Sequence, residues 1–526
     1  MDNKVNLTVK LAISLSLVGL VTSVTAGKII YVDANATGSN DGSSWQDAYN
    51  FLQDALADAD SSQKPVEIRV AQGVYKPDQG ANQIPGDREA TFQLINGVTL
   101  KGGYVGFGAP DADHRRVDVY ETILSGDLNG DDSQTWPSNR DENTYHVVTG
   151  SGTNTTAALD GFTITGGNAT NEEFPWSDLF VSGGGIYNDS NGSPTLTNCT
   201  FSKNRADFSG GGMYNKGSSP TLIKCAFVAN EALVAGGMLN ERASPTVVIC
   251  TFRWNQALIG GGMYNRESNP TVTNSMFSAN KAAGYGGGMY NKGSSPTLVN
   301  CIFSGNSTTT YPASEYFGGG GIYNDDHSNL TLTNCTFVGN SGQNGNGIRC
   351  YSSTLPSNLQ LTNCILWDPG KEISNDDGSV IKISYSDVKG GWPGEGNIDV
   401  DPRFAGLGYW DPNGTPADPG DDFWVDGDYR LKSQAGRYDP NSSSWITDDV
   451  TSPCIDAGDP KAPIGLEPFP NGGVINMGAY GGTAEGSKSY LGEPVCETIV
   501  AGDINGDCKV DLKDLMILAY HWLEER

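Results

Sequence analysis

Near the C-terminus, oxygen-bearing residues recur with the spacing of a calcium-binding loop. Loop positions 1, 3, 5, 7, 9 and 12 would be filled by Asp503, Asn505, Asp507, Lys509 (through its carbonyl group), Asp511 and Asp514. Ca²⁺ takes about six to eight oxygen ligands, and this spacing wraps them around one ion. Cys508 departs from the glycine usual at position 6, and Asp514 from the glutamate usual at position 12. We expect a calcium loop followed by a helix over 512–523; an acidic amphipathic tail without metal is the alternative.

A second group of side-chain oxygens lies in "DLNGDD" at 127–132. Asp127, Asn129 and Asp131 alternate along this stretch, as ligands do at the start of a calcium loop. Turns are rich in Asp, Asn and Gly for conformational reasons alone. Calcium binding and a plain turn therefore both remain open at this position.

The densest cluster of titratable side chains within the central repeats is Asp325, Asp326 and His327. Glycoside hydrolysis needs two or three closely placed carboxylates, whereas a polysaccharide lyase needs a base, often Lys or Arg. The equivalent turn in other repeats carries charges of both signs, for example Lys216 and Glu241. A ladder of mixed charge is typical of a solvated turn, so these three residues are weak catalytic candidates.

The elements that position these residues follow from an internal repeat of about 25 residues. A glycine-rich stretch ends in asparagine at Asn188, Asn215, Asn240, Asn265, Asn291 and Asn324. A second series, mostly cysteine, follows at Cys199, Cys225, Cys250, Ser275, Cys301, Cys335 and Cys364. An aromatic residue lies two positions beyond, at Phe201, Phe227, Phe252, Phe277, Phe303 and Phe337. Each repeat closes on asparagine, at Asn204, Asn230, Asn255, Asn280, Asn306 and Asn340.

Short β-favouring segments such as "TLTNCTF" alternate with Gly, Ser and Asn turns, and no repeat carries a helical period. This pattern predicts an all-β fold, a right-handed parallel β-helix in which each repeat forms one coil. Leu196, Cys199 and Phe201 should point inward, with a bend at Asn198 resetting the alternation. The stacked cysteines should form a buried ladder; free thiols are favoured over disulfides because Ser275 interrupts the series.

The two ends of the chain differ from the repeats. Residues 1–26 have a positive start, a short apolar run and a small-residue cleavage site, as expected of a signal peptide. The β-helix with its N-terminal cap should span 27–405, with regular coils over about 183–366, and the cap should include a helix over 43–60 starting at Ser44. An irregular region (406–490) packs on or follows the helix, and the calcium-loop module occupies 496–526.

Two insertions interrupt the coils at one place, between the closing asparagine and the glycine-rich stretch. They span 169–182 and 307–317, and lie five coils apart, about 24 Å at the strand spacing. Their aromatic and acidic residues include Glu172, Trp176, Asp178, Tyr311, Glu315 and Tyr316. Insertions on one face of a solenoid often mark its binding side, so we expect them to wall a groove for a sugar chain. Lids that only cover apolar turn residues are the alternative.

Several stretches resemble secreted right-handed parallel β-helix proteins of the pectate-lyase-like class. The resemblance rests on "GKIIYVDANATGSNDGSSWQDAYNFLQDAL", "TILSGDLNGDD", "LDGFTITGGN" and the Gly-Gly-Gly-x-Tyr-Asn coils. The segment 428–482 is similar to the C-terminal part of such proteins from planctomycete-type bacteria, and 502–523 is similar to one dockerin repeat. A dockerin normally has two repeats, so docking to a protein partner is the weaker expectation and calcium binding the stronger. A bond between Cys508 and Cys496 would staple this module.

The sequence has a formal net charge of −28, which disfavours nucleic acid and anionic membranes as partners. No stretch after the signal peptide is apolar for long enough to span a bilayer, so we expect a secreted or cell-surface protein. The leading hypothesis is a carbohydrate-binding or carbohydrate-degrading protein acting on a polysaccharide, either a lyase or a glycoside hydrolase if it is an enzyme. The alternative is a non-catalytic, adhesin-like scaffold with a possible protein partner at the C-terminal module.

Overall fold

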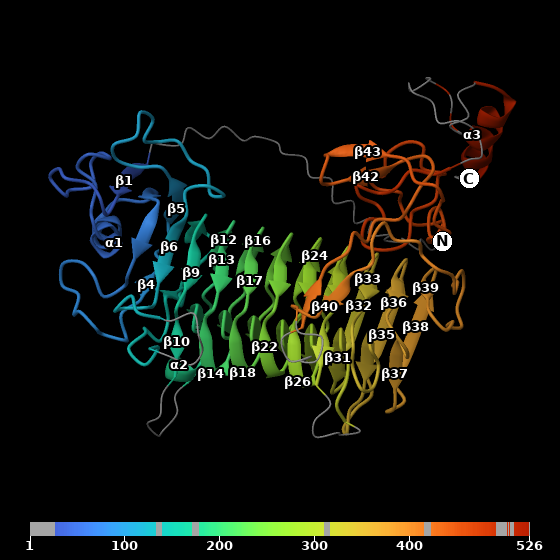
Figure 1. Ribbon diagram of the computed structural model, residues 1–526, viewed down its shortest axis with the longest axis horizontal. Coiled ribbons are helices and arrows are strands. Elements are labelled where there is room, and N and C mark those ends of the chain that lie inside the picture. The colour runs from blue at the N-terminus through green and yellow to red at the C-terminus, as the bar shows by residue number, and fades with distance from the viewer. Residues whose placement is uncertain are drawn as a thin grey trace, which may run out of the picture.

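The computed structural model describes residues 27–132, 139–170, 178–309, 316–414, 422–490 and 510–524, together with Gly502 and Ile504. Parallel strands stack along the long axis of the molecule, and the chain runs from the coils at one end to those at the other (Figure 1). Between Ala158 and Asp325, each coil contributes one strand to each of four sheets, which are numbered 1 to 4 in the order that the chain visits them within such a coil. The predicted parallel β-helix is confirmed.

Sheet 1 comprises β1 (Lys28–Val32), β2 (Val66–Ala71), β5 (Val98–Tyr104), β8 (Ala158–Asp160), β12 (Thr195–Thr197), β16 (Thr221–Ile223), β20 (Thr246–Val248), β24 (Thr271–Thr273), β28 (Thr297–Val299), β32 (Asn329–Thr333), β35 (Asn358–Thr362) and β38 (Val380–Ser384). Sheet 2 comprises β3 (Gly73–Tyr75), β6 (Thr122–Ser125), β9 (Thr163–Thr165), β13 (Thr200–Ser202), β17 (Ala226–Val228), β21 (Thr251–Arg253), β25 (Met276–Ser278), β29 (Ile302–Ser304), β33 (Thr336–Val338), β36 (Ile365–Trp367) and β39 (Asp387–Val388).

Sheet 3 is the shortest and comprises β10 (Asn168–Ala169), β14 (Arg205–Ser209), β18 (Glu231–Val234), β22 (Gln256–Ile259), β26 (Lys281–Tyr285) and β30 (Ser307–Thr308). Sheet 4 comprises β4 (Phe92–Gln93), β7 (Val148–Thr149), β11 (Ile186–Asn188), β15 (Met213–Lys216), β19 (Met238–Glu241), β23 (Met263–Arg266), β27 (Met289–Lys292), β31 (Ile322–Asp325), β34 (Ile348–Cys350) and β37 (Ile373–Asn375).

Identical residues stack on one another because neighbouring coils pair in register. Phe201 pairs with Phe227 across β13 and β17, and the buried phenylalanine rings stack with centroids 4.7–4.8 Å apart. Leu196 and Cys199 are also buried, and Asn198 between them has a φ of +51°, which turns the chain from sheet 1 into sheet 2. The predicted inward residues and the bend are therefore confirmed.

The closing asparagines form a continuous buried ladder. Asn255 accepts hydrogen bonds from the backbone N–H of Asn230 (3.1 Å) and from its Nδ2 (2.9 Å), while its own Nδ2 donates to the carbonyl of Phe227 and to Oδ1 of Asn280 (both 2.9 Å). Asp368 takes the asparagine's place after Asn340 and accepts from that residue's backbone N–H at 2.7 Å. Side-chain amides thus satisfy the backbone groups at the turn between sheets 2 and 3.

Eight cysteines within the described ranges are free and buried. In the predicted ladder, the thiol of Cys225 donates to the carbonyl of Leu196 at 3.4 Å, and Ser275 replaces one rung. Burial raises the pKa of the Cys225 and Cys335 thiols, so these groups stay protonated core side chains. The structure agrees with the preference for free thiols; Cys496 and Cys508 lie outside the described residues.

The N-terminal helix, α1 (Leu52–Ser61), is shorter than the predicted 43–60. It packs on β1 and β2, closing the N-terminal end of the coils (Figure 1). The Ser44 hydroxyl does donate to the Asp47 carboxylate and accept from the Asp47 backbone N–H, but these bonds close a turn instead of starting a helix. The reason is tertiary: backbone hydrogen bonds join Tyr49 to Tyr31 and Asp33, and Trp45 is buried against Tyr31, so this stretch forms bends and a turn along β1.

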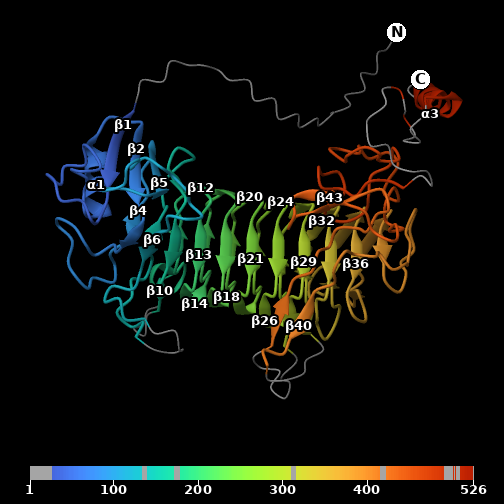
Figure 2. The ribbon, with the colours of Figure 1, turned by 45° about the horizontal axis from the view of Figure 1, so that its top comes forward.

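After β39 the chain returns over the outside of the last coils (Figures 1 and 2). This region contains two antiparallel hairpins, β40 (Tyr409–Asp411) with β41 (Phe423–Val425), and β42 (Arg437–Asp439) with β43 (Ser444–Ile446). Buried Tyr429, Leu431 and Met477 form a second core with Val338 and Ile365 of sheet 2. The irregular region therefore packs on the β-helix.

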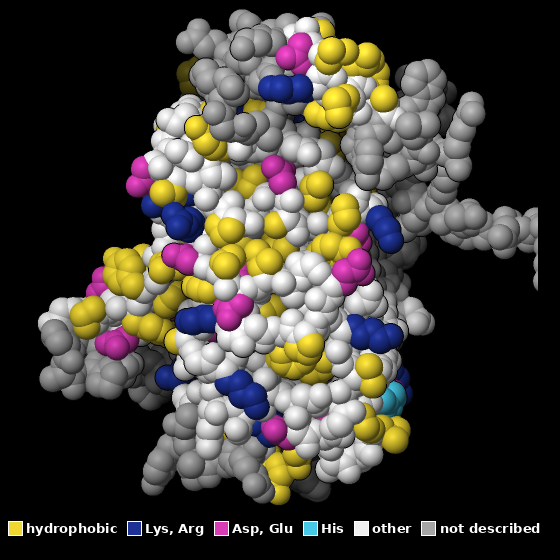
Figure 3. Space-filling view, turned by 90° about the vertical axis from the view of Figure 1, so that its right-hand side faces the viewer, with side chains coloured by type: hydrophobic (Ala, Val, Ile, Leu, Met, Phe, Trp, Pro, Cys, Tyr) yellow, Lys and Arg dark blue, Asp and Glu magenta, His cyan; other side chains and the backbone are white. Residues whose placement is uncertain are grey.

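The remaining helices are α2 (Asp178–Val181) and α3 (Leu512–Glu524). No helix among the described residues is long and apolar enough to cross a membrane. At the C-terminal end of the molecule, acidic and basic side chains are interspersed with hydrophobic ones (Figure 3).

Candidate functional site

Sheet 3 is the face on which the two predicted insertions emerge. The first begins at β10 and the second at β30, the two terminal strands of this sheet. Glu172, Trp176, Tyr311 and Glu315 lie outside the described residues, as does the side chain of Asp178. Tyr316 is 45 % exposed and its ring lies 5.4 Å from that of Tyr351. The predicted floor exists, and the role of the insertions as walls stays a prediction.

The β40–β41 hairpin supplies a wall that the sequence did not indicate. Its anchor is Asp426, which follows β41 and lies against one column of sheet 2. The Asp426 carboxylate accepts hydrogen bonds from the hydroxyls of Ser278 and Ser304 (each 2.7 Å) and pairs with Arg253 at 3.3 Å. Arg253, Ser278 and Ser304 are register partners on β21, β25 and β29. Three successive coils therefore hold the hairpin in place.

Trp424 fills the space that two glycines leave in the coils. A Cβ atom at Gly305 or at Gly339 would lie 2.2 Å from the Trp424 indole, too close for any side chain. Both glycines have positive φ at the turn that precedes the closing asparagine. The Trp424 indole also donates to Asp426 at 3.0 Å and meets the ring of Trp410 edge-on at 5.6 Å. The exposed Trp410 ring is thus held in a fixed position.

A cleft of about 460 Å³ lies between the hairpin and the coils. Its lining comprises Trp254, Gln256, Ala279, Lys281, Ser307, Thr309, Trp410, Asp422, Phe423 and Trp424. Trp254, Trp410 and Phe423 are 38–42 % exposed, so their rings are open to a ligand. The volume falls within the range of about 300–1,000 Å³ that is usual for ligand sites.

The polar floor of the cleft is set by strand register. Gln256 pairs with Lys281, and Lys281 pairs with Ser307, so these side chains form one row along sheet 3. Trp254 occupies the left-handed turn position at the edge of the floor, with a φ of +56°, and the Arg253 guanidinium lies 4.2 Å from its ring centroid. Aromatic faces, an ammonium group, an amide and hydroxyls therefore surround one cavity.

The weak catalytic candidates lie elsewhere, in the turn after β31, and none of the three lines this cleft. Asp325 accepts a hydrogen bond from the Tyr290 hydroxyl at 2.7 Å and lies 3.7 Å from Lys292. Asp326 accepts from the Thr354 hydroxyl at 2.7 Å, which with His327 lowers its pKa. These contacts fix the turn, and the catalytic role of the three residues stays a prediction.

Two residues of the C-terminal calcium loop, Asp511 and Asp514, are described. The buried Asp514 carboxylate accepts backbone hydrogen bonds from Ile504 (2.6 Å) and Asp511 (2.7 Å), so the end of the loop faces its beginning. Asp503, Asn505, Asp507 and Lys509 lie outside the described residues, and calcium binding here stays a prediction.

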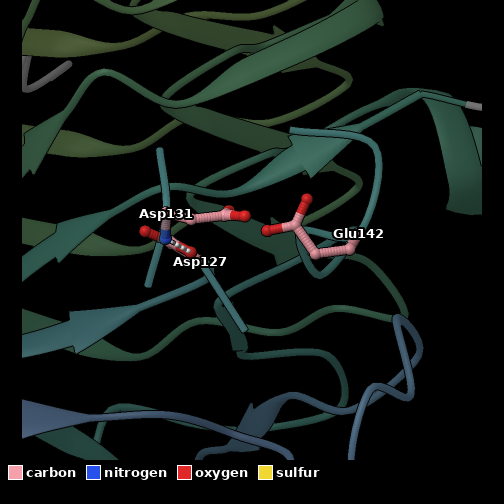
Figure 4. Close-up of side chains that lie close together, drawn as sticks. All are labelled: Asp127, Asp131 and Glu142. Atoms are coloured by element: carbon pink, nitrogen blue, oxygen red, sulfur yellow. Dashed lines mark hydrogen bonds between the residues drawn. The ribbon is translucent and has the colours of Figure 1, made fainter. Parts of the chain in front are cut away.

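The second oxygen group gains a member from a distant segment. Asp127 and Asp131 approach Glu142, and one carboxylate oxygen from each lies within 4.8 Å of the others (Figure 4). The side chain of Asn129 is exposed. Burial raises the pKa of Glu142, and the neighbouring carboxylates of Asp131 and Asp127 raise it further.

With fold and site in view, the class of protein is that of right-handed parallel β-helices. The family model described as "Right handed beta helix region" matches residues 141–284 and 235–388, and a model described as "Disaggregatase related" matches 416–458. A crystal structure of pectate lyase Pel9A is similar at 13 % identity and a TM-score of 0.44, over 86 % of this chain and 96 % of that one. A rhamnogalacturonan lyase is similar at 11 % identity and a TM-score of 0.33, over 72 % and 91 % of the two chains. Curated protein sequences gave no match.

Proposed function

We propose that the protein is a secreted carbohydrate-active β-helix that binds a polysaccharide in the cleft between sheet 3 and the β40–β41 hairpin. The observation that supports this most is the grouping of exposed Trp254, Trp410 and Phe423 around the row of Gln256 and Lys281. A sugar ring presents an apolar C–H face that packs on an aromatic ring, while its hydroxyls need polar partners. This cleft offers both.

The direction of the cleft suits a polymer. The floor is a face of parallel strands that continues along the solenoid axis, with Glu231 next to Gln256 in the same row. Exposed Leu258 lies on β22, the strand that carries Gln256, and exposed Leu233 lies on the adjacent strand β18, so sheet 3 also presents apolar side chains. A chain of sugars can therefore occupy the cleft with one part and lie along sheet 3 with the next.

Affinity electrophoresis of the full-length chain in gels containing acidic or neutral polysaccharides tests the proposal. Trp254→Ala and Trp410→Ala each remove one aromatic face, and a central tryptophan in an interface typically contributes about 2 kcal/mol. We expect at least a tenfold loss of affinity for the retarding polysaccharide. Trp445→Ala is the matched control, because Trp445 is similarly exposed (37 %) but lies on β43. No retardation by any polysaccharide, or equal retardation of all variants, contradicts the proposal.

Turnover is a separate question that the same panel answers. A lyase releases unsaturated uronides, which absorb in the ultraviolet, and a hydrolase releases reducing ends. Binding without release of either product would indicate a non-catalytic carbohydrate-binding solenoid. Absence of both binding and product supports the second candidate, an adhesin-like scaffold, which the near-perfect sequence repeat of the coils favours.

The same proposal includes location and accessory contacts. Export through the segment 1–26 places the cleft outside the cell, where polysaccharides occur. The C-terminal module, with a calcium ion held by its loop, would attach the protein to a protein or cell-surface partner. Detection of the mature N-terminus at Gly27 in culture supernatant tests the first of these statements.

A further inference from the structure

A group of carboxylates outside the cleft lies where the irregular N-terminal coils meet the regular stack. Asp127 and Asp131 belong to the loop after β6, and Glu142 belongs to the segment before β7. Figure 4 shows the carboxyl ends of Asp131 and Glu142 facing each other, with Asp127 beside them. Their oxygens all lie within 4.8 Å of one another. Two ligand atoms on opposite sides of a Ca²⁺ ion, each about 2.3–2.6 Å from it, lie about 5 Å apart, which is close to the separation of these oxygens.

Backbone hydrogen bonds to Asp127 fix the conformation of this loop. Asp127 Oδ1 accepts the backbone N–H groups of Gly130 (2.5 Å) and Asp131 (3.1 Å), and Oδ2 accepts that of Asp132 (3.2 Å). These bonds close the turn, and a carboxylate oxygen of Asp131 lies within 4.8 Å of one from Glu142.

A second observation comes from the amide oxygen of Asn143, next to the carboxylate cluster in sequence, which is buried and accepts no hydrogen bond. Asn143 is fully buried, and its Nδ2 donates to Asp132 Oδ2 (3.1 Å) and to the carbonyl of Gly166 (2.7 Å). The first bond places the amide group of Asn143 next to the Asp132 carboxylate. Its Oδ1, together with Asp132 Oδ1 and Glu142 Oε1, is buried without a hydrogen-bond partner. Leaving one such oxygen unsatisfied costs about 1–3 kcal/mol, and a cation satisfies several at once.

The balance of charge favours a divalent ion. Four carboxylates are involved, those of Asp127, Asp131, Asp132 and Glu142; burial raises the pKa of Asp132 and of Glu142, and the charges of Asp127 and Asp131 raise both further. Two cations are adjacent: Arg140 lies 3.5 Å from Asp132, and Lys76 donates to the carbonyl of Leu128 at 3.0 Å. Four negative and two positive charges leave an excess of two negative charges.

We propose that Asp127, Asp131 and Glu142 bind one Ca²⁺ ion, beside Asp132 and Asn143, which each carry a buried oxygen without a hydrogen-bond partner. The ion would fasten the segment before β7 to the loop after β6. That segment in turn holds the first strand of sheet 3, because Asn168 of β10 donates to the carbonyls of Thr144 and Arg140 (both 2.8 Å). Calcium at this position stabilises the N-terminal edge of sheet 3, whether or not a polysaccharide binds there.

Calcium titration of the metal-free full-length chain by calorimetry tests the site. The predicted C-terminal loop is a second binder, so the measurements are made in an Asp514→Asn background. In that background we expect one equivalent of Ca²⁺. Glu142→Gln and the more exposed Asp131→Asn should each weaken its binding at least tenfold, whereas Glu89→Gln, which removes an exposed carboxylate outside the cluster, should not.

Hydrogen exchange supplies the second readout and does not require the variants to fold equally well. In the Asp514→Asn chain, chelation should raise amide exchange in peptides covering 126–132 and 140–145, while peptides from the central coils stay unchanged. Unchanged calcium affinity in both Glu142→Gln and Asp131→Asn, unchanged exchange on chelation, or binding of Mg²⁺ in preference to Ca²⁺ would overturn the assignment. Calcium binding with no polysaccharide binding would support this site while refuting the proposed function.

Discussion

The cleft depends on one carboxylate, and Asp426→Ala is the substitution that tests this dependence. The Asp426 side chain is 17 % exposed and accepts hydrogen bonds from two serine hydroxyls and one indole N–H, in addition to its ion pair with Arg253. A hydrogen bond to a charged group contributes about 1.5–3 kcal/mol. Three bonds at the low end give about 4.5 kcal/mol, and because these sites are only partly buried, water recovers a share of it. We therefore expect the docked hairpin to lose about 3 kcal/mol, or about 100-fold in its docking equilibrium.

The loss should be local, because the coils keep their phenylalanine and asparagine ladders. In Asp426→Ala, amide exchange of peptides over 404–414 and 422–431 should rise by about two orders of magnitude. Emission from the buried Trp424 should shift to the red, and exchange in sheets 1 and 4 should stay unchanged.

Asp411→Ala is the matched control, since it removes from the same hairpin a carboxylate that accepts a local hydrogen bond from the backbone N–H of Asn413 (2.9 Å). If Asp426→Ala leaves hairpin exchange equal to that of Asp411→Ala, the anchoring argument is wrong. If both variants unfold the coils as well, the hairpin and the solenoid form one cooperative unit, and the hairpin does not undock from the coils independently.

Further predictions concern the ladder and the buried acids. Asn255→Ala removes four hydrogen bonds within the buried ladder and should lower the free energy of unfolding by at least about 4 kcal/mol. Asn329→Ala, which changes an exposed asparagine, should lower it by less than about 1 kcal/mol. Denaturant unfolding measures both values, and equal losses of stability would contradict the role of burial. Burial raises the pKa of Glu467 from 4.5 to about 7, so its folded form holds a proton that the unfolded form has lost. As the pH rises from about 4.5 to 7, the free energy of unfolding should therefore fall by up to about 1.4 kcal/mol per pH unit, and it should level off above pH 7. This slope should be smaller in Glu467→Gln. Parallel curves of Tm against pH for the two proteins would refute the role of Glu467. Asp514→Asn should remove one calcium equivalent from the wild-type chain, measured by calorimetry, and unchanged stoichiometry would exclude the C-terminal loop as a site.

The sequence alone determined the solenoid. Its landmark residues recur about every 25 positions, and each coil contacts chiefly the next one, so a repeat in sequence becomes a stack in space. Inward Phe201, the bend at Asn198 and the buried cysteines followed from strand alternation within a single coil. The helix over 43–60 was predicted too long because the contacts that keep Trp45 and Tyr49 out of the helix are made with β1 and the residue after it, and are not local.

The candidate sites needed the tertiary structure. Trp410 and Trp424 lie outside the repeated part of the sequence. They line the same cleft as Lys281 because Asp426 binds Ser278, which is 148 residues away in sequence. Glu142 likewise joins Asp127 through the return of the chain between two coils, and no spacing in the sequence indicates that encounter. Periodic contacts between neighbouring coils can be derived from sequence because they repeat. A single contact between a distant segment and the outside of the stack is decided by shape and charge, which exist only once the chain has folded.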